Sequence, residues 1–180
     1  MADVKMQPIT RLLVANRGEI ARRIMRTAHE MGIATVAVYA DGDATAPFVR
    51  EADSAISLDG TTSAETYLDM DKVLAACKRT GADAVHPGYG FLAENASFAQ
   101  AVMDAGMRWV GPSPQAIAAM GDKLSAKQLM DEAGVPTLPA RELDAAADSA
   151  AAAREIGYPV RVRAAAGGGE RGMRIVEDQA

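Results

Sequence analysis

The sequence is poor in the residue types that mark several classes of protein. Its 180 residues include one cysteine, Cys77, which excludes a disulfide within the chain and is predicted to be a buried structural thiol. The net charge of -5 at pH 7 offers no basic surface for nucleic acid. No apolar run is long enough to cross a bilayer, and residues 1–8 lack the apolar core of a signal peptide. We therefore expect a cytoplasmic protein without membrane or nucleic-acid partners.

Short apolar runs alternate with amphipathic helical segments in the first part of the chain. The predicted strands are 11–15, 34–40, 55–58, 84–86 and 108–110, and the predicted helices are 20–31, 71–80 and 98–105. Asp69 stands at an N-cap position and Gly81 at a helix end. Strands and helices that alternate in this way predict an α/β fold with a parallel sheet.

A second and smaller part is predicted after Gly111–Pro114, which interrupts the pattern. Two short helices follow, the second capped by Asp122, and a further helix runs from Asp144 to Ile156. Residues 160–163 and 173–176 are predicted to be strands that flank a glycine-rich stretch. One helix and one hairpin are too few to bury a core of their own.

Two loops are predicted to lie at the carboxyl ends of parallel strands, where open α/β folds bind ligands. The first is Asn16–Glu19, whose single glycine does not match the dinucleotide fingerprint; alternatively, Glu19 only stabilises a helix N-terminus. The second is His86–Asn95, which combines glycines with an aromatic ring, a histidine and a carboxylate and would suit a planar polar ligand. Alternatively, it is a tight strand-to-helix connection. His29 and His86 have no Cys or His partners nearby, so a metal site on them is not expected.

Basic groups near the glycine-rich stretch point to an anionic ligand. Lys123 lies in the first turn of a predicted helix, where its charge opposes the helix dipole and would suit a bound phosphate. Arg161, Arg163 and Arg171 flank glycines whose amides are free to approach phosphates. The alternatives are a solvated lysine and an edge strand that carries charge against aggregation.

Four stretches, in this order and spacing, resemble biotin carboxylase. They are 13–21 (LVANRGEIA), 86–95 (HPGYGFLAEN), 120–123 (MGDK) and 166–169 (AGGG), and 133–136 and 157–160 join them. The resemblance covers nearly the whole chain. It implies an ATP-grasp ligase whose Rossmann-like N-terminal domain (the pre-ATP-grasp domain) is followed by a helical connector and an ATP-grasp lid. The implied boundaries are 1–113, 114–142 and 143–180, the last being an incomplete lid.

The resemblance also implies a reaction and its partners. ATP phosphorylates bicarbonate to carboxyphosphate, and the resulting CO2 is captured by a ureido nitrogen of biotin. In an acyl-CoA carboxylase this biotin is carried on a biotin carboxyl carrier domain and serves a carboxyltransferase subunit. The magnesium ligands belong to a C-terminal domain of the family, so neither metal ligands nor catalytic residues are expected in this chain.

The family's functional positions can be carried over residue by residue. The resemblance assigns Lys123, Arg163, Gly168 and Gly169 to the ATP phosphates, Met173 to the nucleotide base, Tyr89 and Gly90 to the biotin ring, and Arg26 and Glu30 to a homodimer interface. Each of these roles is an expectation that the resemblance brings.

Three residues depart from the family's pattern in the lid. Arg163 replaces a lysine, Arg161 an apolar residue, and Glu170 a glycine. A forked guanidinium does not act as the point charge of a lysine, and Glu170 adds negative charge to a loop that faces phosphates. We expect weakened ATP binding and no turnover by this chain alone. A non-catalytic binding or assembly module is the alternative, and an artificial fragment or altered version is a third.

Overall fold

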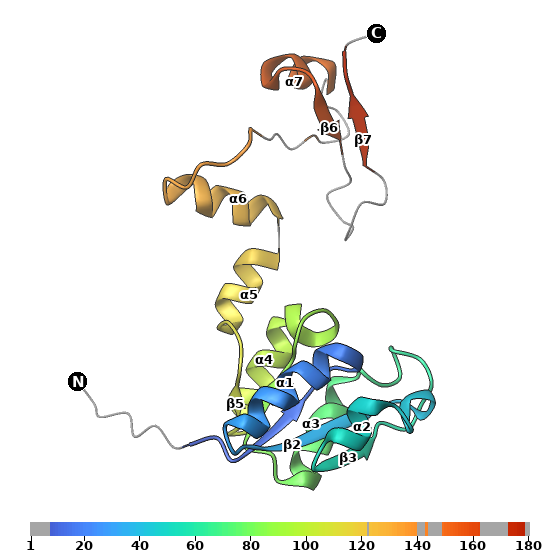
Figure 1. The fold of residues 1–180 in the computed structure, drawn as a ribbon. Helices are drawn as coiled ribbons and strands as arrows, with labels where there is room; N and C mark the ends of the chain where they lie inside the picture. Colours follow the sequence, from blue (N-terminus) through green and yellow to red (C-terminus); the bar gives the residue numbers. More distant parts are fainter. Residues whose placement is uncertain (1–7, 122, 140–142, 144–148, 163–172, 179–180) are drawn as a thin grey trace, which may run out of the picture. The chain divides into compact units, whose positions relative to one another are not determined.

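The computed structural model describes residues 8–121, 123–139, 143, 149–162 and 173–178, and for 123–125 it describes the backbone alone. The chain divides into two compact units, Met1–Ala118 and Ala119–Ala180. Figure 1 shows a sheet with its helices in the first unit, and helices with a small sheet in the second. Among the described residues no helix is long and apolar enough to span a membrane.

The first unit is built on a five-stranded parallel sheet with the strand order β3-β2-β1-β4-β5. The strands are β1 (Arg11–Val14), β2 (Ala34–Tyr39), β3 (Ser54–Ser57), β4 (Ala84–His86) and β5 (Arg108–Trp109). β1 is central, and its Leu13 lies between Val36 of β2 and Val85 of β4. The parallel sheet and all of its strands were predicted from the sequence, and each predicted strand end is either the observed one or one residue away from it.

Helices cover the two faces of this sheet. They are α1 (Gly18–Glu30), α2 (Pro47–Glu51), α3 (Met70–Thr80) and α4 (Ala96–Asp104), with short 3-10 turns η1 (Asp41–Asp43) and η2 (Phe91–Glu94). Because successive side chains of a strand point to opposite faces, β1 serves two cores. Leu12 and Val14 pack with α1 and α2, whereas Leu13 packs with α3 and α4 (Figure 1). Both cores are built from apolar contacts.

Helix ends follow the predicted chemistry. The carboxylate of Asp69 accepts a hydrogen bond from the backbone N–H of Lys72 at 3.0 Å, and Gly81 ends α3 with φ of +65°. Asn95 caps α4 by accepting from the N–H of Phe98 at 2.9 Å. Cys77 is fully buried, as predicted, and burial raises the pKa of its thiol to about 12, which keeps it protonated and unreactive.

The second unit contains the helices α6 (Lys123–Glu132) and α7 (Ser149–Ile156) and the strands β6 (Val160–Val162) and β7 (Arg174–Val176). The strands form the predicted antiparallel pair, with Arg161 opposite Ile175. α5 (Pro114–Gly121) crosses the boundary between the units. Lys127 donates to Asp131 at 2.7 Å and to Thr137 at 2.8 Å, and so ties α6 to the segment after it. The predicted cap at Asp122 and the start of the helix at Asp144 lie outside the described residues.

A substitution of Phe98 tests the core between the sheet and α4. Its ring is fully buried and meets Trp109 edge to face, with centroids 5.6 Å apart. We expect Phe98→Ala to lower the free energy of unfolding by about 3–5 kcal/mol, because a buried ring is replaced by a cavity. Urea unfolding followed by circular dichroism measures this. Met103→Ala, on the exposed side of the same helix, is the control and should change stability by less than about 0.5 kcal/mol.

Candidate functional site

The sheet has a switch point between β1 and β4. The chain leaves β1 for α1 on one face and leaves β4 for α4 on the other face, so the loops after these neighbouring strands separate. Ligands of open α/β folds bind at such a point, at the carboxyl ends of the strands. Asn16 follows β1, and His86 ends β4. Both loops proposed from the sequence therefore meet here.

Asn16 joins the two loops through its side-chain amide. Its Nδ2 donates to the backbone oxygens of Pro87 at 2.8 Å and Tyr89 at 2.9 Å, and its Oδ1 accepts from the N–H of Arg17 at 2.9 Å. The side chain is fully buried. All of these bonds require the nitrogen to face the loop, because an amide oxygen turned toward two carbonyl oxygens would repel them. No separate role for Asn16 was predicted from the sequence.

Gly88 lies directly against this amide. Its φ is +66°, and an added Cβ would stand 2.7 Å from both Asn16 Nδ2 and Ile20 Cγ2. Only a glycine fits this approach, since the added atom would meet a buried amide in addition to an unfavourable backbone conformation. The glycines of the loop therefore let its backbone pack closely on the first turn of α1.

His86 supports the same loop from β4. Its Nδ1 accepts the backbone N–H of Gly88 at 3.0 Å, so the neutral ring carries its proton on Nε2. Burial lowers the pKa of His86 below its ordinary value, which keeps the ring neutral near pH 7. His86 therefore stabilises the turn by accepting this hydrogen bond from Gly88.

Tyr89 projects from the loop with 62% of its surface exposed. Its hydroxyl donates to Glu19 Oε1 at 2.6 Å. This hydrogen bond is the largest cause of a raised pKa of the Tyr89 phenol, because the bond to a carboxylate favours the protonated form. Glu19 lies in the first turn of α1, so it stabilises that helix end and also contacts the loop.

A second network lies at the ends of β1 and β2. Arg17 Nη2 is 2.5 Å from Asp43 Oδ1, and the Tyr67 hydroxyl donates to Asp43 Oδ2 at 2.6 Å. The guanidinium carbon of Arg17 lies 5.7 Å from the Tyr67 ring centre. Burial by itself would raise the pKa of Asp43, but the hydrogen bonds from Arg17 and Tyr67 outweigh it and lower the pKa. Sequence reasoning missed Asp43 and Tyr67, because their pairing depends on residues far apart in the chain.

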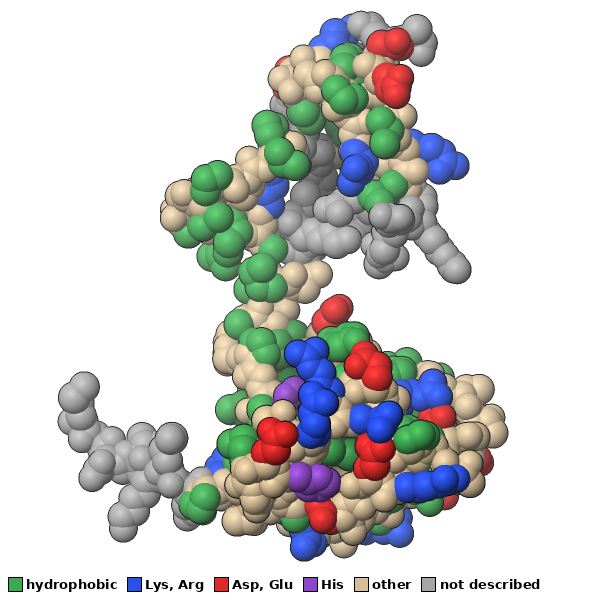
Figure 2. All heavy atoms as spheres, viewed as in Figure 1, with side chains coloured by type: hydrophobic (Ala, Val, Ile, Leu, Met, Phe, Trp, Pro, Cys, Tyr) green, Lys and Arg blue, Asp and Glu red, His purple; other side chains and the backbone are tan. Residues whose placement is uncertain are grey.

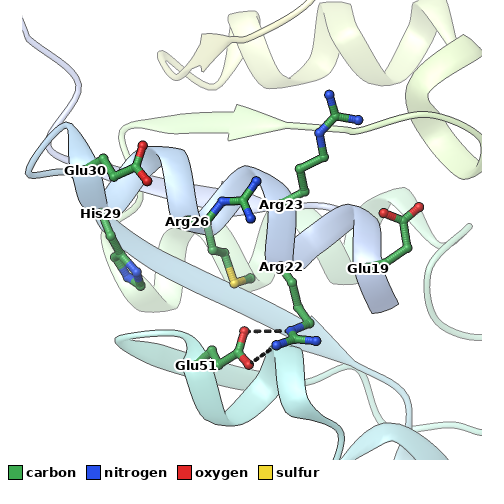
Figure 3. A pocket seen from close by; sticks show the side chains of 8 residues that line it. Glu19, Arg22, Arg23, Arg26, His29, Glu30 and Glu51 are labelled. Carbon is green, nitrogen blue, oxygen red and sulfur yellow. Dashed lines mark hydrogen bonds and ion pairs between the residues drawn. The ribbon is translucent and has the colours of Figure 1, made fainter.

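The outer face of α1 carries a shallow hollow lined by charged side chains (Figures 2 and 3). Arg22 forms an ion pair with Glu51 of α2 at 2.6 Å, while Arg26 and Glu30 are exposed. The lining residues are Glu19, Arg22, Arg23, Met25, Arg26, His29, Glu30 and Glu51. The lining contains three arginines and three glutamates, whose formal charges cancel.

An apolar hollow of about 440 Å³ adjoins the loop on the other side of α1. Its wall includes Ile20, Ile24 and Met31 of the α1 region, together with Gly88 and Tyr89. On this face α1 and α2 pack on the sheet in one apolar cluster, which also includes Ala84 of β4. The loop that bears Tyr89 therefore stands between an apolar and a charged surface.

The remaining predicted site residues belong to the second unit. Lys123 is the first residue of α6, but its side chain is not among the described parts. Met173 directly precedes β7 and is partly buried, and Arg161 is exposed on β6. Arg163, Gly168 and Gly169, like Glu170 and Arg171, lie outside the described residues. Within the described ranges, no three His, Cys, Asp or Glu side chains come together as metal ligands would.

Two protein families match the chain. The family "Biotin carboxylase, N-terminal domain" matches residues 8–117, and "Carbamoyl-phosphate synthase L chain, ATP binding domain" matches residues 122–180. The chain belongs to the biotin carboxylase N-terminal domain family. The resemblance found in the sequence motifs is thereby confirmed, and so is the α/β fold.

Individual relatives agree with this membership. The chain is 51% identical over 177 residues to the "Biotin-dependent acyl-coenzyme A carboxylase alpha3 subunit" of Mycobacterium leprae, covering 97% of the chain and 30% of that protein. A Campylobacter jejuni biotin carboxylase solved with beta-gamma-ATP has a TM-score of 0.86 and 44% identity over 95% of this chain and 39% of that one.

A second solved relative has a nucleotide and bicarbonate bound. The biotin carboxylase domain dimer of Hydrogenobacter thermophilus 2-oxoglutarate carboxylase, with MgADP and bicarbonate, has a TM-score of 0.87 and 43% identity over 96% of this chain and 38% of that one. The chain thus spans between 30% and 39% of the length of these relatives.

His86 provides a test of the site's geometry. Burial lowers the pKa of His86 in the folded chain. Between that folded pKa and the unfolded pKa of about 6.5, the unfolded chain therefore binds a proton at His86 that the folded chain does not. Its contribution to stability is therefore fully present above about pH 6.5 and is lost as the pH falls from there through the folded pKa. Nitrogen-15 NMR of the imidazole should show an unprotonated Nδ1 at pH 7 and a titration midpoint below 6.5. A protonated Nδ1 at pH 7, or a midpoint above 6.5, would contradict this geometry.

Proposed function

We propose that this chain is the N-terminal part of a biotin carboxylase that serves an acyl-CoA carboxylase. The single observation that carries the proposal is the family match over residues 8–117. The loop at the switch point supports it, because Tyr89 and Gly90 project at the sheet edge where α/β folds bind ligands. The reaction is the ATP- and bicarbonate-dependent carboxylation of biotin.

The proposed reaction has two steps. Bicarbonate attacks the terminal phosphorus of ATP, which breaks the bond to ADP and gives carboxyphosphate. Carboxyphosphate then releases phosphate and CO2. A ureido nitrogen of biotin passes its proton to the released phosphate and captures the CO2. Phosphoryl transfer depends on positioned charge around the phosphates, so the groups that enclose ATP decide the rate.

The roles within this chain follow the three proposed parts, 1–113, 114–142 and 143–180. Tyr89 and Gly90 in the first part would meet the biotin ring. Lys123 in the second part would contact an ATP phosphate. In the incomplete lid, Arg163, Gly168 and Gly169 would contact phosphates, and Met173 would lie beside the base. Magnesium would supply charge neutralisation at the phosphates, with ligands from the C-terminal domain that the longer relatives have.

Arg163 and Glu170 favour a second candidate function, a non-catalytic binding or assembly module. Both replace residues that the resemblance assigns to the ATP phosphates, a lysine and a glycine. A negative charge that faces a triphosphate raises the free energy of the bound state. The two candidates therefore differ in whether the completed protein turns over ATP.

An assay of the completed protein separates these candidates. The chain is joined after Ala180 to the part of the Campylobacter jejuni biotin carboxylase that follows the matching region, and bicarbonate-dependent ATP cleavage is measured with free biotin. We expect turnover, and we expect Arg163→Lys with Glu170→Gly to raise kcat/KM for ATP by about tenfold, a change of about 1.4 kcal/mol. The unmodified chain by itself should show none.

The outcomes of this assay are distinct. No turnover by either joined protein, while both are folded by circular dichroism, would support the non-catalytic module and refute the enzyme. Equal kcat/KM values for both would refute the proposed damage to the ATP site. Lys78→Ala, on the exposed end of α3, serves as the matched surface control and should leave the kinetics unchanged.

We also propose that α1 forms a homodimer interface through Arg26 and Glu30. Both side chains are exposed and lie one helical turn apart, within a surface of three arginines and three glutamates (Figure 3). A two-fold axis would place Arg26 of one copy opposite Glu30 of the other, and both contacts would form together. A biotin carboxyl carrier domain and a carboxyltransferase subunit would be the further partners.

Charge reversal tests this interface. Arg26→Glu and Glu30→Arg should each weaken self-association by about tenfold or more, because each brings like charges together across the axis. An equimolar mixture of the two variants should associate again, since opposite charges then face each other. Sedimentation velocity measures this, with Lys78→Glu on the other face of the sheet as the control. Variants that sediment like the parent chain would rule out these contacts.

A further inference from the structure

The exposed ring of Tyr89 is held by a polar contact more than by packing. With 62% of the residue exposed, its ring has few neighbours to fix its orientation, whereas its hydroxyl lies 2.6 Å from Glu19 Oε1. An exposed aromatic side chain normally samples several rotamers. A short hydrogen bond to a carboxylate restricts that sampling, because charge-assisted bonds are among the stronger ones.

The backbone that carries Tyr89 is fixed separately. Asn16 donates to the carbonyl oxygens of Pro87 and Tyr89, and Gly88 packs on the Asn16 amide. The Tyr89 backbone therefore does not depend on Glu19. The side chain of Glu19 can thus control the direction of the ring while the loop stays in place.

Glu19 itself is exposed and belongs to α1, a helix whose buried side packs firmly on the sheet through Ala21, Met25 and Ala28. Its carboxylate is therefore presented from a rigid element. A role in helix stability alone would be met by any acidic residue in the first turn and would not need a partner on the other loop. The hydrogen bond from Tyr89 to Glu19 is thus a feature that helix stability alone does not require.

We propose that Glu19 is a positioning residue for biotin, because its carboxylate holds the Tyr89 hydroxyl and so orients the exposed ring on the loop that Asn16 fixes. This inference rests on the proposed function, in which Tyr89 and Gly90 meet the biotin ring. Glu19 touches no reacting atom in this proposal. It acts through Tyr89, and its loss changes the affinity for biotin and leaves the ATP site alone.

Kinetics of the joined protein described above test the role. Glu19→Ala removes the acceptor and should raise KM for free biotin by about fivefold to tenfold, with KM for ATP unchanged. Glu19→Gln loses the negative charge that favours the helix end but keeps an oxygen that accepts from Tyr89, so it should restore most of the biotin affinity. A purely structural role at the helix end predicts the same loss in both variants.

A double-mutant cycle with Tyr89→Phe shows whether Glu19 acts through the hydroxyl. Phenylalanine keeps the ring and removes the donor, so Tyr89→Phe should raise KM for biotin as Glu19→Ala does. If the two residues act as a pair, the double variant is no worse than either single variant. Additive effects would overturn the proposal, and so would an unchanged KM for biotin in Glu19→Ala.

A spectroscopic readout on the 180-residue chain completes the test and needs no turnover. Carbon-13 NMR of labelled tyrosines should show the pKa of Tyr89 falling toward its ordinary value in Glu19→Ala, because the hydrogen bond to Glu19 raises it. An unchanged pKa would overturn the positioning contact. Failure of the joined protein to carboxylate biotin would refute the proposed function, whereas turnover with an unchanged KM would refute this inference alone.

Discussion

The buried amide of Asn16 is the constraint on which the arrangement of this sheet edge depends. Parallel strands lie about 4.8 Å apart, but the loops that follow β1 and β4 turn to opposite faces and have no ladder to join them. The Asn16 amide donates to the carbonyl oxygens of Pro87 and Tyr89, and its bond to Pro87 is buried. A buried carbonyl without a partner is costly, so one side chain holds an irregular loop in a single conformation.

α1 connects this edge to the rest of the unit. Its inner side packs small and flexible side chains, such as Ala21 and Met25, against the sheet, which lets the helix axis lie close to the strands. Its first turn meets the Tyr89 loop, and its outer side presents the charged surface with Arg26 and Glu30. A single rigid helix therefore carries the proposed biotin contact and the proposed dimer contact.

Sequence reasoning succeeded where the signal is local. The strands follow from apolar runs, and α3 follows from the cap at Asp69, because capping depends on residues three positions apart. α2 was not predicted, since a helix of five residues is too short to show a periodic pattern. The pairing of Arg17 with Asp43 was not predicted either, because it joins loops that only the strand order brings together.

The sequence by itself determined the family and the parallel sheet, because motif order, apolar periodicity and glycine positions are properties of neighbouring residues. Tertiary structure decided which residues work together. Asn16 lies 73 positions and Glu19 70 positions before Tyr89 in the chain, and their contacts with it exist because β1 and β4 are adjacent in the sheet. Strand order depends on how both faces bury their apolar side chains, which is a property of the whole unit.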